Sequence, residues 1–220
     1  MHSTRTAAFV AAFVLTATAS ADSPFDGKSL AGWKAKHSDK GKWVVGTAFA
    51  EDNKLAAKEG GSDLVNVQPG SDLFTEQKYG DVTVEVEFMV PKGSNSGVYL
   101  MGEYEVQILD SYGKANDKLT QGDLGALYSA AAPKVNAAKA PGEWQKFVID
   151  FQAPKFDGTK KVANAKFIKV ILNDVVLHEN VEMKSQTPGG LTGKEAAEGP
   201  LMFQGDHGPV AFRNIKVSKK

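Results

Sequence analysis

The sequence contains no cysteine, and this absence excludes several kinds of chemistry at once. Without thiols the protein forms no disulfide, has no thiolate nucleophile, offers no cysteine ligand to zinc and carries no cysteine for lipid attachment. Its stability must then come from a hydrophobic core, which a chain of 220 residues is long enough to bury. We therefore expect one domain without covalent cross-links and without a membrane anchor.

An excess of charge of either sign is also missing. The chain has 26 basic and 26 acidic side chains. Removal of residues 1–21 takes away only Arg5, which leaves a net charge of 25 − 26 = −1. Nucleic-acid-binding domains are typically basic over one face, and attraction to an anionic membrane needs a similar excess. The composition predicts neither of these partners.

Long hydrophobic runs are absent beyond the first part of the chain. Residues 6–17 are mostly apolar, follow the basic Arg5 and precede Ala19-Ser20-Ala21, which fits an A-x-A cleavage site. The run is shorter than the roughly 18 apolar residues of a membrane-spanning helix. We interpret residues 1–21 as a signal peptide and residues 22–220 as one mature domain that is periplasmic or secreted.

Helical periodicity is scarce, whereas strand-like alternation recurs between clusters of Gly, Pro, Asn and Asp. In residues 81–90, Val or Phe occupies every second position, and Thr83, Glu85 and Glu87 lie between them. Further strands are predicted at residues 98–101, 104–109, 143–151, 166–172, 175–179, 201–204 and 210–217. This pattern favours an all-β sandwich of antiparallel strands.

The connections between these strands are of two kinds. Asn173-Asp174 suits a two-residue hairpin, because both residue types tolerate positive φ. Residues 110–123 and 185–199 are predicted as long loops, the second with a helical turn near residues 194–197. Loops of this length are uncommon in a compact sandwich unless they serve a binding surface or are disordered, so either loop could border a site.

Glu105 and Gln107 are the first candidate site residues. In strand 104–109 the apolar residues take one parity, so Glu105 and Gln107 share the solvent face. A sugar lying across that face would meet an acid and an amide that both donates and accepts. Exposed acids on strands are more often solubilising groups, and the residues alone leave both interpretations open.

Six motifs occur in order along nearly the whole mature chain. They are FDGKSLAGW (25–33), YGDVTVEVEFMVPKGSNSGVYL (79–100), EVQILD (105–110), GALY (125–128), PGEW (141–144) and FQGDHGPVAFRNIKV (203–217). Together they resemble the 3-keto-disaccharide hydrolase domain family. The resemblance implies a concanavalin-like jelly roll whose concave face receives a saccharide substrate, and it favours a functional Glu105.

His207 is the best candidate for proton transfer. It lies in a short turn, residues 204–208, where an imidazole can reach a site and titrate near neutral pH. The alternative is a turn histidine that hydrogen-bonds to backbone. His37 and His178 lie outside the motifs and are interpreted as surface residues, so neither a three-histidine metal site nor any other cofactor is expected.

Arg213 is a candidate for holding a substrate carbonyl or hydroxyl through its fork of donors. Its parity is irregular, because Ile215 and Val217 share it, so a bulge or two buried faces must intervene. A structural Arg213 paired to an acid such as Asp206 is the alternative.

Three more residues complete the predicted substrate site. Asn95 either caps a turn or contacts ligand, Tyr128 offers a flat face for a sugar to stack on, and Gln204 belongs to the last motif. Aromatic residues on strands are most often core, and we expect Trp33 and Trp43 to be structural.

The resemblance suggests an elimination mechanism. A ketone at C3 of a sugar acidifies the C2 proton and places the glycosidic oxygen in the β position, so one base and an oxyanion site suffice. His207 or Glu105 is the base and the other the acid, with Arg213 and Gln107 holding the 3-keto oxygen. Two other functions stay open, a non-catalytic lectin-like module and an envelope domain that binds protein.

Overall fold

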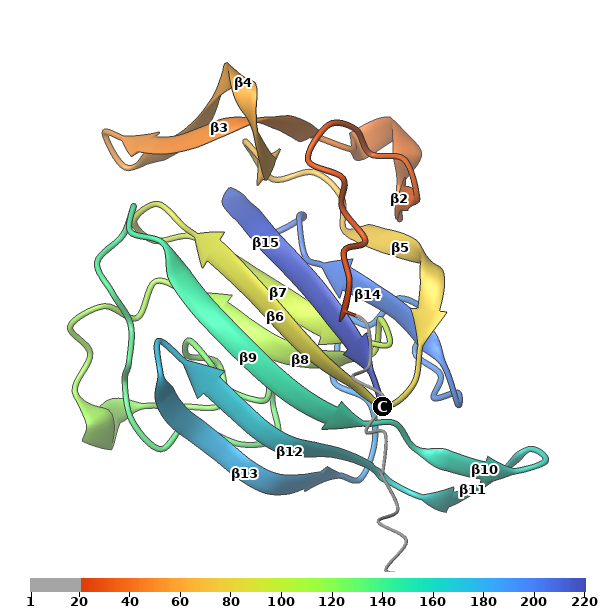
Figure 1. The fold of residues 1–220 in the computed structure, drawn as a ribbon. Coiled ribbons are helices and arrows are strands. Elements are labelled where there is room, and N and C mark those ends of the chain that lie inside the picture. The colour runs from red at the N-terminus through yellow and green to blue at the C-terminus, as the bar shows by residue number, and fades with distance from the viewer. Residues whose placement is uncertain (1–20) are drawn as a thin grey trace, which may run out of the picture.

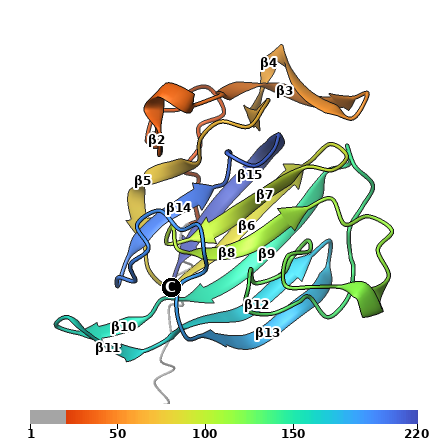
Figure 2. The same ribbon diagram turned by 180° about the vertical axis from the view of Figure 1, so that it is seen from behind.

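The fold is a sandwich of two antiparallel sheets, seen from its two sides in Figure 1 and Figure 2. This computed structural model describes residues 21–220. The predicted signal peptide lies outside the described residues except for Ala21, so export remains a prediction that N-terminal sequencing of the mature protein would test. Within residues 21–220, no helix is long and apolar enough to cross a membrane.

The described part of the chain contains fifteen strands and two short 3-10 helices. The strands are β1 (Ala21–Asp22), β2 (Trp33–Ala35), β3 (Trp43–Glu51), β4 (Lys54–Asn66), β5 (Leu73–Tyr79), β6 (Val82–Met89), β7 (Asn95–Leu100), β8 (Tyr104–Leu109), β9 (Gln145–Gln152), β10 (Lys155–Asp157), β11 (Lys160–Ala163), β12 (Ala165–Leu172), β13 (Val175–Met183), β14 (Gly199–Phe203) and β15 (Val210–Lys219). The 3-10 helices are η1 (Ser38–Lys40) and η2 (Asn116–Lys118).

The larger sheet has eight strands in the order β13-β12-β9-β6-β15-β4-β3, with β1 paired to β15. The smaller sheet has five, in the order β2-β5-β14-β7-β8, and lies toward the viewer in Figure 2. The β10–β11 hairpin projects from one corner of the molecule (Figure 1). These observations confirm the predicted all-β sandwich of antiparallel sheets.

The hydrophobic core lies between the sheets and comes from the predicted alternation. Val84 and Phe88 of β6 and Val106 of β8 are almost completely buried. Aromatic stacking joins the layers, since the rings of Phe203 and Phe212 from opposite sheets lie 3.9 Å apart. Burial of each such large side chain contributes about 1.5–3 kcal/mol. The core is therefore sufficient to hold the sandwich without disulfides.

Trp33 and Trp43 are structural, as predicted. Both are buried, and their indole nitrogens donate to the carbonyl oxygens of Pro24 and Ser71 at 2.8 and 2.7 Å. These bonds satisfy the polar edge of each ring inside the core.

Backbone geometry confirms two local predictions. Asn173 and Asp174 both have positive φ, 50° and 66°, as a two-residue hairpin between β12 and β13 requires. The predicted bulge in β15 is also present, because Arg213 pairs with Glu87 while Lys216 pairs with Glu85. One extra residue therefore interrupts β15, which explains the irregular parity of this strand.

Two sequence predictions need correction. The segment 194–197 contains no helical turn, and its Glu195 side chain instead accepts from the Tyr104 hydroxyl at 2.5 Å and from Nζ of Lys161 at 2.7 Å. His178 is buried instead of lying on the surface, with Nε2 donating to the carbonyl oxygen of Gly125 at 2.9 Å, and burial lowers its pKa. His37 is exposed, as predicted.

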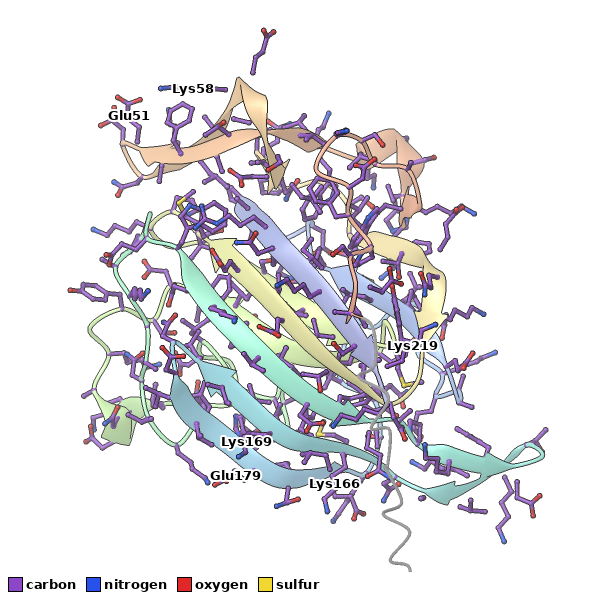
Figure 3. All side chains as sticks on the ribbon, viewed as in Figure 1. Glu51, Lys58, Lys166, Lys169, Glu179 and Lys219 are labelled. Carbon is purple, nitrogen blue, oxygen red and sulfur yellow. The ribbon has the colours of Figure 1, made fainter. Side chains whose placement is uncertain are left out.

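Charged side chains cover the outer face of the eight-stranded sheet. Lys169 of β12 and Glu179 of β13 lie side by side there (Figure 3), with Nζ and Oε1 4.0 Å apart. Both side chains are roughly half exposed. The charged side chains on this face are therefore open to solvent.

Candidate functional site

A pocket of about 230 Å³ opens on the outer face of the five-stranded sheet, and residues from β7, β8 and three connecting loops line it. Its lining residues are Asn95, Tyr99, Glu105, Gln107, Tyr128, Pro188, Gly189, Gln204 and His207. Six of the seven predicted site residues are thus brought together, although the sequence separates them by more than a hundred positions.

Glu105 lies on the floor of this pocket. It pairs across the β7–β8 hairpin with Tyr99, and its carboxyl group lies over Gly97. A Cβ atom on Gly97 would come within 2.3 Å of Oε1 of Glu105, so any larger residue would displace the carboxyl group. The predicted parity of Glu105 and Gln107 is correct, but the surrounding loops cover them and leave both almost fully buried.

The surroundings of Glu105 favour its neutral form. Burial raises its pKa to about 8, and the negative charges of Asp72 and Asp206 act in the same direction. The neighbouring Tyr99 hydroxyl lowers this pKa only in part. Burial and the Glu105 charge together raise the pKa of Tyr99 strongly. At neutral pH both groups are therefore protonated.

Three amide oxygens in the pocket are buried and lack a hydrogen-bond partner. They are Oδ1 of Asn95, Oε1 of Gln107 and Oε1 of Gln204, among five such side-chain atoms in residues 21–220. A buried polar atom without a partner costs about 1–3 kcal/mol, so proteins rarely keep one without a reason. Their grouping around Glu105 indicates a ligand that brings several hydroxyl donors.

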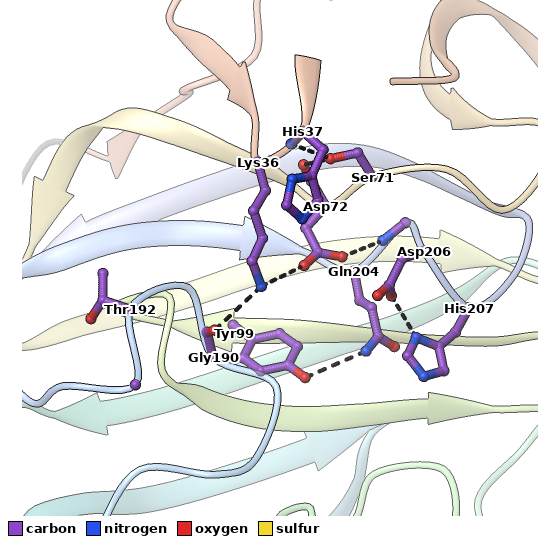
Figure 4. Close-up of polar contacts among 12 residues, drawn as sticks. Lys36, His37, Ser71, Asp72, Tyr99, Gly190, Thr192, Gln204, Asp206 and His207 are labelled. Atoms are coloured by element: carbon purple, nitrogen blue, oxygen red, sulfur yellow. Dashed lines mark hydrogen bonds and ion pairs between the residues drawn. The ribbon is translucent and has the colours of Figure 1, made fainter. Parts of the chain in front are cut away.

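His207 and Asp206 stand at the mouth of the pocket in the turn between β14 and β15. Nδ1 of His207 lies 2.5 Å from Oδ1 of Asp206 (Figure 4). About half of each side chain is exposed. When Nδ1–H donates to the carboxylate, Nε2 keeps its lone pair. The pair can therefore accept a proton from a bound ligand.

A partly buried ion pair between Lys36 and Asp72 supports both walls of the pocket (Figure 4). Oδ1 of Asp72 accepts from the backbone N–H of Gly205 at 3.1 Å, next to the Asp206–His207 pair. Oδ2 of Asp72 lies 3.5 Å from Nζ of Lys36, which also donates to the carbonyl oxygen of Gly190 at 3.3 Å. One carboxyl group thus connects the turn that carries His207 to the loop beside Gly189.

Arg213 does not belong to this pocket, which corrects its predicted role as a substrate ligand. Its strand, β15, lies in the eight-stranded sheet, so an outward side chain points away from the sandwich on the other side. Nε donates to Oε2 of Glu87 at 2.7 Å, and the guanidinium lies 4.0 Å from the ring centre of Trp144. The alternative prediction, a structural Arg213 paired to an acid, is correct in kind, but the acid is Glu87 and not Asp206.

A larger cavity of about 360 Å³ lies nearby, with Phe74, Met101 and Leu191 in its wall. Its buried acid is Glu103, whose oxygens accept from Thr192 N–H and Oγ1 at 2.7 Å and from Gly193 N–H at 3.1 Å. Glu103 therefore holds the loop in place, and both of its carboxyl oxygens already accept hydrogen bonds from the protein. We favour the smaller pocket as the functional site.

Sequence reasoning missed three lining residues, Tyr99, Pro188 and Gly189. The position of Tyr99 could have been inferred from the alternation of β7, because its neighbours Val98 and Leu100 enter the core and Tyr99 must face the other side of the sheet. Pro188 and Gly189 belong to an irregular loop, for which no periodic signal exists. Within residues 21–220, no group of three or more His, Asp or Glu side chains gathers to hold a metal ion.

The fold and the site together define a jelly-roll sandwich with a polar ligand pocket on its smaller sheet. The family model for the 3-keto-alpha-glucoside-1,2-lyase-like domain matches residues 20–218. The chain belongs to this family, as the motifs predicted.

Individual relatives agree with this assignment. A curated 3-keto-disaccharide hydrolase from Bacteroides thetaiotaomicron is 26% identical over 150 residues, which cover 57% of this chain and 50% of the relative. The match thus spans half the length of that protein. A crystal structure from Parabacteroides distasonis, provisionally named a glycosyl hydrolase, has a TM-score of 0.66 at 27% identity, covering 91% of this chain and 84% of that one. A second from the same organism has a TM-score of 0.60 at 19% identity, covers 90% and 92%, and supports the fold alone.

Proposed function

We propose that this protein cleaves 3-keto-glycosides, with 3-keto-disaccharides as the substrate class. The observation that carries the proposal is the content of one pocket: a protonated carboxyl group at Glu105, a His207–Asp206 pair and three amide oxygens without partners. Sugar hydroxyls are the donors that such oxygens lack. Membership of the family and the name of the B. thetaiotaomicron relative support the same substrate class.

The proposed reaction is an elimination followed by hydration. A base removes the C2 proton, which the C3 ketone makes acidic, and an enolate forms. The enolate electrons then make a C1–C2 double bond while the C1–O bond breaks, and the leaving oxygen takes a proton from an acid. Water adds across the double bond, so the sum is hydrolysis. Each proton transfer by a positioned group is typically worth about 10²–10⁴-fold in rate.

Two features of the pocket support an assignment of the two proton-transfer roles that the sequence leaves open. His207 acts as the base, because its Nδ1–H donates a hydrogen bond to Asp206 and Nε2 is left free to accept a proton. Glu105 acts as the acid, because it holds a proton at neutral pH. The amide of Gln107 donates to the enolate oxygen, a role that does not involve Arg213.

The test uses the purified chain with a 3-keto-disaccharide and with its unoxidised parent. We expect release of free sugar from the keto compound alone, with solvent deuterium entering C2. His207→Gln is expected to lower turnover by at least about a hundredfold, because the base is lost. His37→Gln is the matched control, since His37 is exposed and lines no part of the pocket.

Two results would contradict the proposal. An unchanged rate in the His207→Gln variant would remove His207 from the reaction. If the folded protein binds the keto sugar but cleaves none of it, the protein is a lectin-like module, and if it binds no saccharide, the pocket serves another ligand.

A further inference from the structure

An open groove adjoins the pocket on the side of Tyr128. Its volume is about 570 Å³, and it is lined by Leu119, Thr120, Gln121, Gly122, Tyr128, Ser129 and Ala132. Tyr128 lines both the groove and the pocket, so it stands at the boundary between them. A ligand longer than the pocket can therefore pass from one to the other across the Tyr128 ring.

The pocket by itself is too small for two sugar rings. Its volume of about 230 Å³ lies below the ~300–1,000 Å³ of typical small-molecule sites. The larger cavity cannot take the second ring, because the loop 184–198 separates the two spaces. That loop gives Pro188 and Gly189 to the pocket and Leu191 to the larger cavity, and the two share no lining residue.

The walls of the groove are held in place before any ligand arrives. Asp123 is buried beneath them and accepts from the N–H and Oγ1 of Thr120, both at 2.7 Å, and from Nζ of Lys114. Gln121 Nε2 donates to the carbonyl oxygen of Ala130 at 3.1 Å. Because these bonds fix the loop, a ligand that binds there pays little ordering entropy.

We propose that this groove binds the leaving sugar of the substrate, so that Tyr128 and Gln121 select disaccharides over glycosides with small leaving groups. The inference rests on the proposed function, which places the reacting ring in the pocket. The Tyr128 ring offers a face for the second sugar, and Gln121 and Ser129 offer polar contacts around it. The groove thus sets leaving-group preference and the pocket carries the chemistry.

Gly122 provides a direct way to fill the groove. A Cβ atom there would lie 3.9 Å from both Cε2 of Tyr128 and Oγ1 of Thr120, which is ordinary contact, and Gly122 is not among the residues with positive φ. Gly122→Trp therefore places an indole against Tyr128 on the groove side. Gly122→Ala is the matched control, because it also replaces glycine by a residue with a Cβ atom but leaves the groove open.

The experiment measures kcat/KM for a 3-keto-disaccharide and for the methyl glycoside of the same 3-keto sugar. We expect Gly122→Trp to lower the disaccharide value by at least about tenfold, as loss of a sugar contact of ordinary strength would, and to change the methyl glycoside value by less than about twofold. Gly122→Ala is expected to resemble the wild type on both substrates. An equal loss on both substrates, or no loss on either, overturns the proposal.

A second variant keeps the test valid if Gly122→Trp does not fold. Gln121→Ala removes an exposed side chain of the groove, and we expect about a threefold loss for the disaccharide alone. If the wild type cleaves neither compound, the proposed function fails. The proposal for the groove is then tested by measuring the affinity for both compounds. It holds only if both Gly122→Trp and Gln121→Ala weaken binding of the disaccharide and leave binding of the methyl glycoside unchanged.

Discussion

The two sheets present acids on their outer faces in very different surroundings. On the eight-stranded sheet Glu85 lies 2.6 Å from Lys146, and Glu87 is paired with Arg213, in positions open to water. On the five-stranded sheet Glu105 lies under loops without a cation against it. Each acid follows from the same alternation along a strand. The candidate site differs from the other surface in its cover of loops and in the lack, among residues 21–220, of a cation paired with its acid.

The energetic consequence differs as much as the geometry. A solvent-exposed ion pair such as that between Lys169 and Glu179 (Figure 3) contributes about 0.2–1 kcal/mol, and salt screens it. Burial of Glu105 beside unpartnered amide oxygens instead lowers stability, which proteins accept chiefly where a ligand is bound. The contrast predicts opposite responses to the same substitution on the two faces.

The largest effect is expected on turnover. Glu105→Gln removes the proposed acid and should lower kcat for a 3-keto-disaccharide by about a thousandfold. Glu87→Gln makes the same chemical change on the other face and should leave kcat within about twofold. Steady-state kinetics of both purified variants checks this. Equal losses would show that the two faces do not differ in function.

The dependence of stability on pH should separate the two glutamates by sign. The pKa of Glu105 is raised to about 8, so its contribution to stability is complete below the unfolded pKa of about 4.3 and is lost as pH rises through 8. Partial burial acts to raise the pKa of Glu87, but hydrogen bonds from Asn214 and Arg213 outweigh it and lower the pKa. Its contribution is present at neutral pH and is lost in acid.

Urea unfolding of the wild type and both variants between pH 3 and pH 9 measures this difference. Relative to the wild type, Glu105→Gln should gain stability from pH 5 to 8 by about 1 kcal/mol per pH unit. Glu87→Gln should lose a constant amount over that range and regain it near pH 3. Parallel curves for the two variants would exclude a raised pKa at Glu105.

The smallest effect is expected at Arg213. Arg213→Met keeps the aliphatic contact with Trp144 but removes the charge that pairs with Glu87. We expect a loss of about 1 kcal/mol in the free energy of unfolding and no change in kcat/KM. Thermal unfolding measures the change in stability, and steady-state kinetics measures kcat/KM. A tenfold loss of kcat/KM in a folded Arg213→Met variant would show that Arg213 takes part in the reaction.

The parts of the site that the sequence predicted are those with a local signal. Glu105 and Gln107 follow from strict alternation, and His207 and Gln204 follow from a turn between two strands. Arg213 has the same kind of signal and was placed wrongly. Alternation along a strand predicts which side of its own sheet a residue faces. It does not predict which of the two sheets the strand joins.

The support beneath the site had no local signal at all. Asp72 meets the backbone of Gly205 across 133 positions, and Lys36 meets Gly190 across 154. His178 was misjudged for a related reason, since the segment around Gly125 that covers it lies 53 positions away. Such contacts arise only from tertiary packing, which periodicity in a single sequence does not contain.

The Asp72 carboxyl group has one more consequence, which concerns folding. The hydrogen bonds that close the pocket join the beginning, the middle and the end of the chain, so none of them forms until distant segments meet. Closing such long loops costs chain entropy that local contacts do not repay. The pocket is therefore a property of the completed sandwich, and binding of a ligand there reports that these distant segments have reached their native positions.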